Sequence, residues 1–232
     1  MHFQHSARLW RDFPALVPGV LYAEGIDRDV EVGARADRFA AVAKARLADG
    51  PESELPEIQA WRRAFTKMGL KPTQYRCAAE SLLRRFRKEG SLPRLHPLVD
   101  LCNAVSLAFA IPVAVLDAGQ VGWPLVVRYA AGDEDYLTFA GDTEHPAVGE
   151  VIFADRAGRA HARRWTNRQS GLSAVRDSTA AVLIVAEALH DSAASDVREL
   201  IATLAAELGA VWPDRPVSAV LTAASPHFTF GV

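Results

Sequence analysis

The chain has 232 residues, of which 50% are hydrophobic, 8% aromatic and 23% charged, and its formal net charge is −2 at pH 7. This composition is typical of a folded globular protein and excludes a disordered chain, a collagen-like repeat and a disulfide-rich scaffold. No run reaches the roughly 18 apolar residues of a membrane helix, and residues 1–13 lack the apolar core of a secretion signal, so we expect a cytoplasmic protein without a membrane segment.

The first part of the chain predicts one strand and one helix. Residues 1–13 are expected to be a frayed terminus on which His2 and His5 are solvated. The apolar run over residues 16–26 predicts a strand region. Apolar residues at helical spacing between Val32 and Leu47 predict an amphipathic helix that covers a sheet.

Three further helices are predicted before residue 110. One passes through residues 61–65 and ends at Gly69, a second runs from Tyr75 to Gly90, and a third follows Pro97 and continues to Phe109. On the third helix, Asp100 and Asn103 project from the face opposite the apolar stripe. We therefore expect these two polar side chains to face something other than the core of their own helix.

The second half of the chain changes to the two-residue period of strands. The predicted strands cover residues 113–116, 125–129, 136–139, 151–154, 160–165 and 181–188. A helix over about 195–208 and a strand near 217–222 complete the pattern. Helices followed by strands indicate an α+β fold, because a parallel α/β fold would alternate the two.

No cofactor or metal is expected from the motifs. Glycine-rich nucleotide-binding patterns are absent, Ser173 lacks the closing glycine of a nucleophile elbow, and the histidines are scattered. Cys77 and Cys102 lie far apart without a second cysteine nearby, so we expect both to be reduced and buried.

Positive charge is concentrated in two segments. Residues 61–88 contain nine basic residues and one acid, Glu80, and residues 156–176 contain six arginines and no acid. Such segments suit a polyanion whose phosphates meet arginine and lysine. Their aromatic residues would then stack on unpaired bases; these are Trp61, Phe65, Tyr75, Phe86 and Trp165. The alternative is a solvated basic surface whose aromatic residues belong to the core.

One motif on the predicted helix that follows Pro97 resembles a known family. Pro97, Asp100, Asn103 and Val105 form a P-x-x-D-x-x-N-x-V pattern, followed by Pro112 and Asp117. The pattern and its spacing resemble the B3/B4 domain of the bacterial phenylalanyl-tRNA synthetase β subunit, and the similarity extends over about residues 82–187. Segments 61–65, 68–72, 75–76 and 163–169 are similar to those of freestanding B3/B4 proteins.

The resemblance implies a fold and a domain organisation. We expect an α+β fold with a barrel-like mixed β-sheet core and flanking helices. A single domain is expected over residues 1–232, with a strand and helix in 1–60, the motif-bearing core in 61–190 and a helix and strand in 191–232.

The resemblance also implies an activity. In the synthetase this domain hydrolyses the ester of tRNA that carries tyrosine instead of phenylalanine. Asn103 falls on the editing-site asparagine and is the expected catalytic residue. Ala114 stands where the synthetase has a pocket histidine, and Val185 stands near the glutamate that binds the tyrosine hydroxyl, with Glu187 two positions further on. We therefore expect an amino acid other than tyrosine.

The remaining site residues follow from the same resemblance and from the basic segments. The expected substrate pocket is formed by Arg76, Glu80, Ala114, Arg164, Trp165, Asn167, Gln169 and Val185. The expected tRNA contacts are Arg62, Lys71, Arg84, Arg85, Arg87 and Lys88.

Three functional interpretations stay open. The first is a hydrolase that deacylates mischarged tRNA in trans, with the aminoacylated acceptor end of tRNA as its partner. The second is a non-catalytic module that binds tRNA or an amino acid, and the third is an enzyme acting on a small metabolite. The sequence does not identify the amino acid, the tRNA or the oligomeric state.

Overall fold

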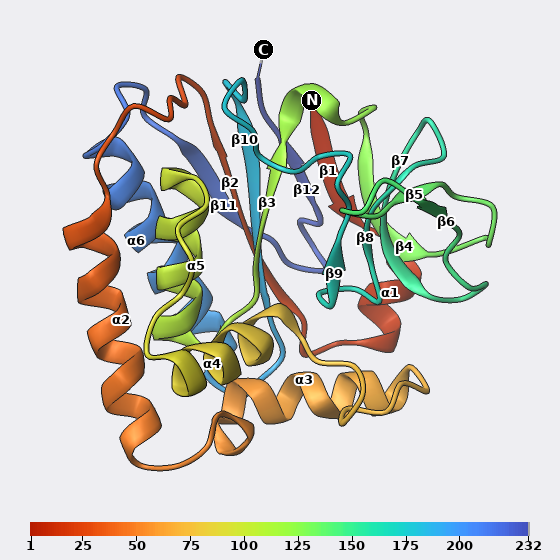
Figure 1. The fold of residues 1–232 in the computed structure, drawn as a ribbon. Helices are drawn as coiled ribbons and strands as arrows, with labels where there is room; N and C mark the ends of the chain where they lie inside the picture. The colour runs from red at the N-terminus through yellow and green to blue at the C-terminus, as the bar shows by residue number, and fades with distance from the viewer. Residues whose placement is uncertain (232) are drawn as a thin grey trace.

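The computed structural model of the protein, shown in Figure 1, describes residues 1–231. The helices are α1 (Ala7–Asp12), α2 (Gly33–Ala48), α3 (Pro56–Lys67), α4 (Ala78–Glu89), α5 (Pro97–Phe109) and α6 (Ala193–Gly209), with short 3₁₀ turns at Glu52–Glu54 and Ala118–Gln120. The strands are β1 (His2–His5), β2 (Val17–Ala23), β3 (Val113–Asp117), β4 (Leu125–Tyr129), β5 (Tyr136–Leu137), β6 (Thr143–Glu144), β7 (Val151–Asp155), β8 (Ala160–Arg163), β9 (Arg168–Gln169), β10 (Val182–Ala188), β11 (Val217–Val220) and β12 (His227–Thr229).

The strands form two main sheets and one small hairpin. The larger sheet has the strand order β12-β1-β4-β7-β8-β9, the second has the order β11-β2-β10-β3, and β5 pairs with β6 alone. All pairs in the four-stranded sheet are antiparallel, whereas β1 and β4 of the larger sheet are parallel. The α+β class is confirmed. The barrel-like core is not, because the hydrogen bonds of residues 1–231 leave the two sheets separate.

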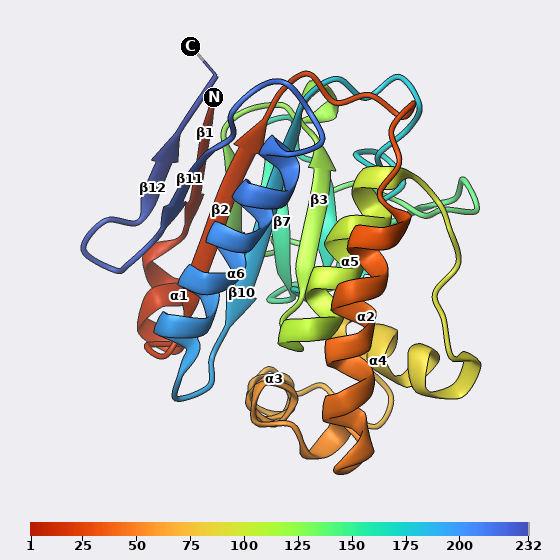
Figure 2. The same cartoon turned by 90° about the vertical axis from the view of Figure 1, so that its left-hand side faces the viewer.

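The two sheets and the helices form layers. Helices α5 and α6 cover one face of the four-stranded sheet, with α2 packed outside α5, and the six-stranded sheet lies on the opposite side (Figures 1 and 2). Helices α3 and α4 lie across one end of this arrangement (Figure 1). That end is where the candidate site is found.

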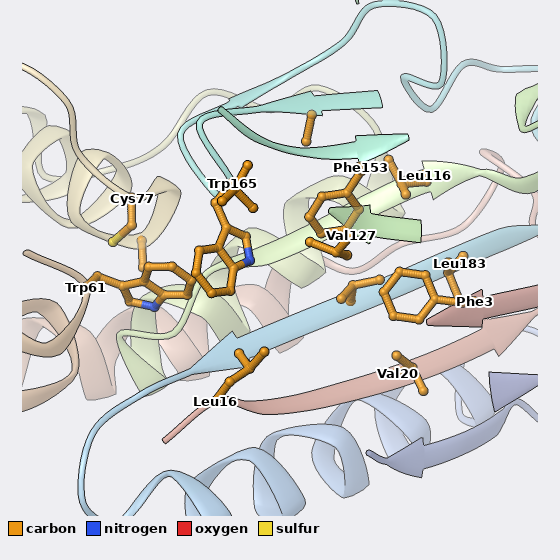
Figure 3. Close-up of a cluster of buried hydrophobic side chains, with 14 of the residues drawn as sticks. Phe3, Leu16, Val20, Trp61, Cys77, Leu116, Val127, Phe153, Trp165 and Leu183 are labelled. Carbon is orange, nitrogen blue, oxygen red and sulfur yellow. The ribbon is translucent and has the colours of Figure 1, made fainter. Parts of the chain in front are cut away.

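Strand β10 lies at the centre of the layers and contributes to both cores. Leu183 and Val185 belong to the cluster between the two sheets, drawn in part in Figure 3, whereas Val182 and Ile184 pack against α5 and α6. Alternate residues of a strand point to opposite faces, and both faces of β10 are covered. This explains why the whole strand reads as one apolar run in the sequence.

The expected boundaries mostly agree with the structure, and two differences matter for the site. The N-terminus is not frayed: residues 2–5 form β1 between β4 and β12, and His5 is buried. The strand expected over 160–165 ends at Arg163, because Arg164 and Trp165 adopt left-handed backbone angles, with φ of 46° and 60°. Trp165 therefore turns back into the core between the sheets.

Helix α5 is held at its start by local interactions. His96 caps it, with Nδ1 accepting a hydrogen bond from the backbone N–H of Leu98 (3.2 Å), and Pro97 occupies the first helical position. Asp100 Oδ1 accepts a hydrogen bond from the backbone N–H of Leu95 (2.9 Å), which fixes the preceding loop. Within the described part of the chain, no helix is both long and apolar enough to cross a membrane.

Candidate functional site

A small cavity lies where β3, β10 and the β8–β9 turn meet the start of α4. Its volume is about 60 Å³. Five of the residues expected to form the pocket line it, namely Ala114, Trp165, Asn167, Gln169 and Val185, together with Glu187. Val185 lies directly opposite Ala114 in the antiparallel pairing of β10 with β3. Sheet register thus brings together two positions that are distant in sequence.

Glu187 shares the inward face of β10 with Val185 and is only 1% exposed. Its Oε1 accepts hydrogen bonds from His5 Nε2 (2.6 Å) and from Trp165 Nε1 (2.9 Å). Trp61 Nε1 donates to its backbone carbonyl (3.2 Å). The expected solvated role of His5 is therefore wrong, since this side chain is a buried partner of the carboxylate.

The β8–β9 turn is attached to both neighbouring elements. Asn167 Nδ2 donates to the carbonyl of Arg76 (2.7 Å), and the backbone N–H of Ala78 donates to the carbonyl of Thr166 (2.7 Å). Gln169 Nε2 donates to the carbonyl of Val115 on β3 (2.6 Å). Consecutive non-glycine residues with positive φ are energetically costly, so these bonds are what keep Trp165 directed inward.

A second, larger cavity adjoins the first. Its volume is about 290 Å³, and it is lined by His96 and Asn103 at α5, by Phe139, and by Val113 and Gln169, which also line the small cavity. Asn103 is half-buried, and its amide has no hydrogen-bond partner among residues 1–231. The expected catalytic asparagine thus lies in the larger cavity and not in the small one.

His96 lines this larger cavity, and its free ring nitrogen is buried behind the wall. Its Nδ1 accepts the backbone hydrogen bond of the helix cap, which places the ring proton on Nε2. Nε2 is buried and unpaired within the described residues. Burial lowers the pKa of His96, so the ring is neutral at pH 7.

Three of the expected pocket residues lie outside both cavities. Glu80 is buried and accepts from Arg62 (2.5 Å), while Arg76 Nε lies 3.5 Å from the same carboxylate. Arg164 lies with its guanidinium 4.7 Å from the ring centre of Tyr75. Arg62 and Glu80 therefore join α3 to α4, and the backbone carbonyl of Arg76 accepts a hydrogen bond from the cavity-lining turn.

Much of the positive charge of the two basic segments is compensated in the fold. Arg87 pairs with Glu52 (2.9 Å), Arg85 with Glu89 (2.9 Å), and Arg163 with Glu144 (2.5 Å) and Glu150 (2.9 Å). Five basic side chains of residues 61–88 have no ion pair with any described acid, namely Arg63, Lys67, Lys71, Arg84 and Lys88. All five are exposed, and Lys67 donates to the backbone carbonyl of Asp12.

The expected stacking of bases on aromatic side chains is wrong for most of these rings. Four of the rings are buried in the hydrophobic core, namely Trp61, Phe65, Phe86 and Trp165. Tyr75 is half-buried beside Arg164. The alternative weighed from sequence, in which the rings belong to the core, holds for these four.

One cluster has the composition of a metal site. Glu57, His190 and Asp196 can offer ligand atoms that lie within 4.8 Å of one another. However, Arg46 Nη2 already contacts Glu57 Oε1 (2.7 Å), and His190 Nε2 already bonds Asp196 Oδ2 (2.8 Å). The positive charge of Arg46 means that this donor set does not require a cation.

Comparisons with known proteins extend these observations. A family model described as the B3/4 domain matches residues 60–203. The phenylalanine–tRNA ligase beta subunit of Haemophilus influenzae is 23% identical over 116 residues, which is 50% of this chain and 14% of that protein. A crystal structure of an N-terminal fragment of the phenylalanyl-tRNA synthetase beta subunit from Pyrococcus horikoshii aligns with a TM-score of 0.45 and 10% identity, over 89% of this chain and 48% of that one.

Proposed function

This chain belongs to the B3/4 domain family, and on that premise we propose that it is a deacylase that hydrolyses the ester of mischarged aminoacyl-tRNA in trans. A phenylalanine–tRNA ligase beta subunit is similar to half of this chain, and a tRNA substrate would place the protein in the cytoplasm. The proposed substrate is the aminoacylated acceptor end, and the proposed domain spans the whole described chain.

The observation that carries this proposal is the pair of adjoining cavities. The larger, of about 290 Å³, has the scale of a nucleoside, and the smaller, of about 60 Å³, has the scale of a short side chain. They share Val113 and Gln169 as a common wall. An aminoacyl-adenosine placed across both would have its ester beside that wall.

The chemistry required of such a site is modest. The oxygen of a bound water attacks the ester carbonyl carbon, the bond from that carbon to the ribose oxygen breaks, and the ribose oxygen leaves with a proton. The products are a free amino acid and uncharged tRNA. The protein needs to position the water and to stabilise the developing negative charge on the carbonyl oxygen. We assign the first task to Asn103, whose amide has no hydrogen-bond partner within residues 1–231 and which lines the larger cavity.

The phosphates of the acceptor end require exposed cations. Ala78, at the start of α4, lines the small cavity, and Arg84 and Lys88 lie one and a half to three turns further along this helix. At a rise of about 1.5 Å per residue, Lys88 lies roughly 15 Å from Ala78 along the helix axis. We propose that Arg84 and Lys88, together with Lys71 in the segment before α4, contact backbone phosphates near the site.

The alternative is a module that binds the same substrate without hydrolysing it, which the lack of a pocket histidine at Ala114 favours. The experiment that separates the two is a panel of purified aminoacyl-tRNAs incubated with the wild-type protein. We expect loss of the acyl group from one class of tRNA well above the spontaneous rate. Binding of aminoacyl-tRNA with only the spontaneous rate for every member of the panel would contradict the hydrolase and favour the binding module.

A further inference from the structure

The small cavity contains a carboxylate with unused hydrogen-bonding capacity. Glu187 Oε1 is occupied by His5 and Trp165, whereas no hydrogen bond to Oε2 is found within residues 1–231. No arginine or lysine of this part of the chain forms an ion pair with Glu187. Oε2 keeps some accessible area and faces the cavity. A ligand that fills the cavity displaces water from this oxygen, and leaving the acceptor without a donor is then costly. A ligand that supplies a donor would therefore be favoured here.

The surroundings fix the direction of that oxygen. His5 and Trp165 hold Oε1 from two separate elements, and Trp61 holds the backbone carbonyl of the same residue. Because the carboxylate cannot reorient without breaking these bonds, the free oxygen has a defined position in the wall of the cavity. A fixed acceptor of this kind selects a donor by position as well as by charge.

The remaining walls limit the size of the ligand. The cavity of about 60 Å³ holds roughly four to six water-sized groups, at about 10–15 Å³ for each. Ala114, Val185 and Phe153 give it apolar sides. A threonine side chain, with three heavy atoms, is smaller than this limit, whereas a phenol ring is larger.

We infer that the small cavity selects an aminoacyl group whose short side chain carries a hydroxyl, namely threonine or serine, which donates a hydrogen bond to Glu187 Oε2. The inference rests on the proposed function, since it names the acyl group that this site accepts. Valine has the shape of threonine but no donor, so it would leave the carboxylate oxygen unpaired. The loss of a hydrogen bond to a charged group corresponds to about a 10- to 100-fold difference in binding.

The test uses binding, which does not require catalysis. Adenosine carrying a threonyl or a valyl group through a non-hydrolysable 3′-amide is titrated into the full chain by calorimetry. We expect the threonyl compound to bind about 10- to 100-fold more tightly than the valyl compound, and a tyrosyl compound to bind more weakly than either. Equal binding of the threonyl and valyl compounds, or binding of neither, would overturn the inference.

Two variants test whether the carboxylate of Glu187 causes the preference for the threonyl compound. Glu187→Gln retains a carbonyl oxygen for His5 and Trp165 but replaces the free oxygen with an amide nitrogen, so the threonyl-to-valyl ratio should fall towards one. Glu199→Gln, an exposed position on α6, removes the same charge and should keep the wild-type ratio. A folded Glu187→Gln protein with the full wild-type ratio would contradict the role of this carboxylate. If its melting temperature shows that it does not fold, the wild-type ratio alone decides.

The inference and the proposed function can fail separately. Preferential binding of the threonyl compound without deacylation of threonyl-tRNA would support the proposed selectivity of the small cavity and contradict the proposed deacylase activity. Deacylation that is equally fast for threonyl-tRNA and valyl-tRNA supports the hydrolase and overturns the preference.

Discussion

Asn103 is half-buried on α5, where it lines the larger cavity and a separate one of about 130 Å³, and its amide makes no hydrogen bond within residues 1–231. Asp100, one turn earlier, is the residue that bridges helix and loop, through its bond to the backbone of Leu95. An asparagine at this position can serve catalysis or can merely tie the helix to the sheet. Its missing partners argue against the structural role.

Asn103→Ala should therefore reduce activity without reducing stability. If the amide positions water, its loss should lower the single-turnover deacylation rate by about 10²–10³-fold. The melting temperature should hardly change, because no hydrogen bond within the protein is lost. Single-turnover kinetics and thermal melting on the same preparation measure both quantities.

Asp100→Ala is the matched control on the same helix. It should lower the melting temperature by removing the bond to Leu95, while leaving most of the deacylation rate. Equal losses of rate in the two variants would show that Asn103 acts only through the integrity of α5.

At the scale of elements, α4 presents the cations that the fold leaves unpaired. Arg84 and Lys88 are spaced four residues apart, so they lie on the same face of the helix. Arg85 and Arg87 of the same helix are already paired with Glu89 and Glu52. Phosphate contacts on this helix should therefore depend on the first two residues.

The double variant Arg84→Ala/Lys88→Ala should bind tRNA more weakly and with a shallower dependence on salt. Each phosphate contact contributes roughly −0.7 to −0.9 to the slope of log K against log salt concentration, so losing two should make the slope less steep by about 1.5. Arg38→Ala/Lys44→Ala on α2 removes the same charge elsewhere and should leave the slope unchanged. An unchanged slope in the α4 variant would mean that this face meets only water.

The elements differ in how well local sequence predicts them. The apolar periodicity of the sequence predicts helix α5, and an apolar run predicts strand β10. The alternation of side chains along a strand then predicts that Val185 and Glu187 share a face. The inward turn at Trp165 is not predicted in this way, because its two consecutive left-handed residues are stabilised by bonds to residues outside the turn, among them Arg76, Val115 and Glu187. The same applies to His5, which is 182 residues away from Glu187.

At the scale of the molecule, charges pair across the fold. The acids that neutralise the two basic segments include Glu52, Glu144 and Glu150, all of which lie outside those segments. A local count of charge therefore overstates the positive surface. The sequence predicted the α+β class and five of the residues that line the small cavity, but it could not show which cations remain free.

Buried carboxylates make the stability of the fold depend on acid. Burial raises the pKa of Asp155, but hydrogen bonds from His161, Arg159 and the backbone of Gly122 outweigh it and hold that pKa well below its usual range. Burial is likewise outweighed at Glu150, where Arg163 lowers the pKa, and at Glu134, where backbone N–H groups and Arg128 do so. Carboxylates with depressed pKa values add stability above their unfolded pKa of about 4, and this contribution is lost as the pH falls through their folded pKa.

The free energy of unfolding should thus be highest near neutral pH and should fall steadily below about pH 4. Asp155→Asn should lower it by about 2 kcal/mol or more at pH 7 and should reduce the drop between pH 5 and pH 3. Urea unfolding at several pH values measures both effects, with the exposed Asp37→Asn as control. A drop of wild-type size in Asp155→Asn would show that this carboxylate is not a source of the acid sensitivity.

The measurement that most directly tests the site itself is single-turnover deacylation after the small cavity has been filled. Ala114→Leu adds a larger side chain on β3, opposite Val185, in the space assigned to the aminoacyl side chain. If the paired cavities hold the aminoacyl end of tRNA, a folded Ala114→Leu protein should lose about 10²-fold or more of its deacylation rate, while its affinity for uncharged tRNA stays at the wild-type value. A folded Ala114→Leu protein that deacylates its substrate at the wild-type rate would contradict the assignment of this site.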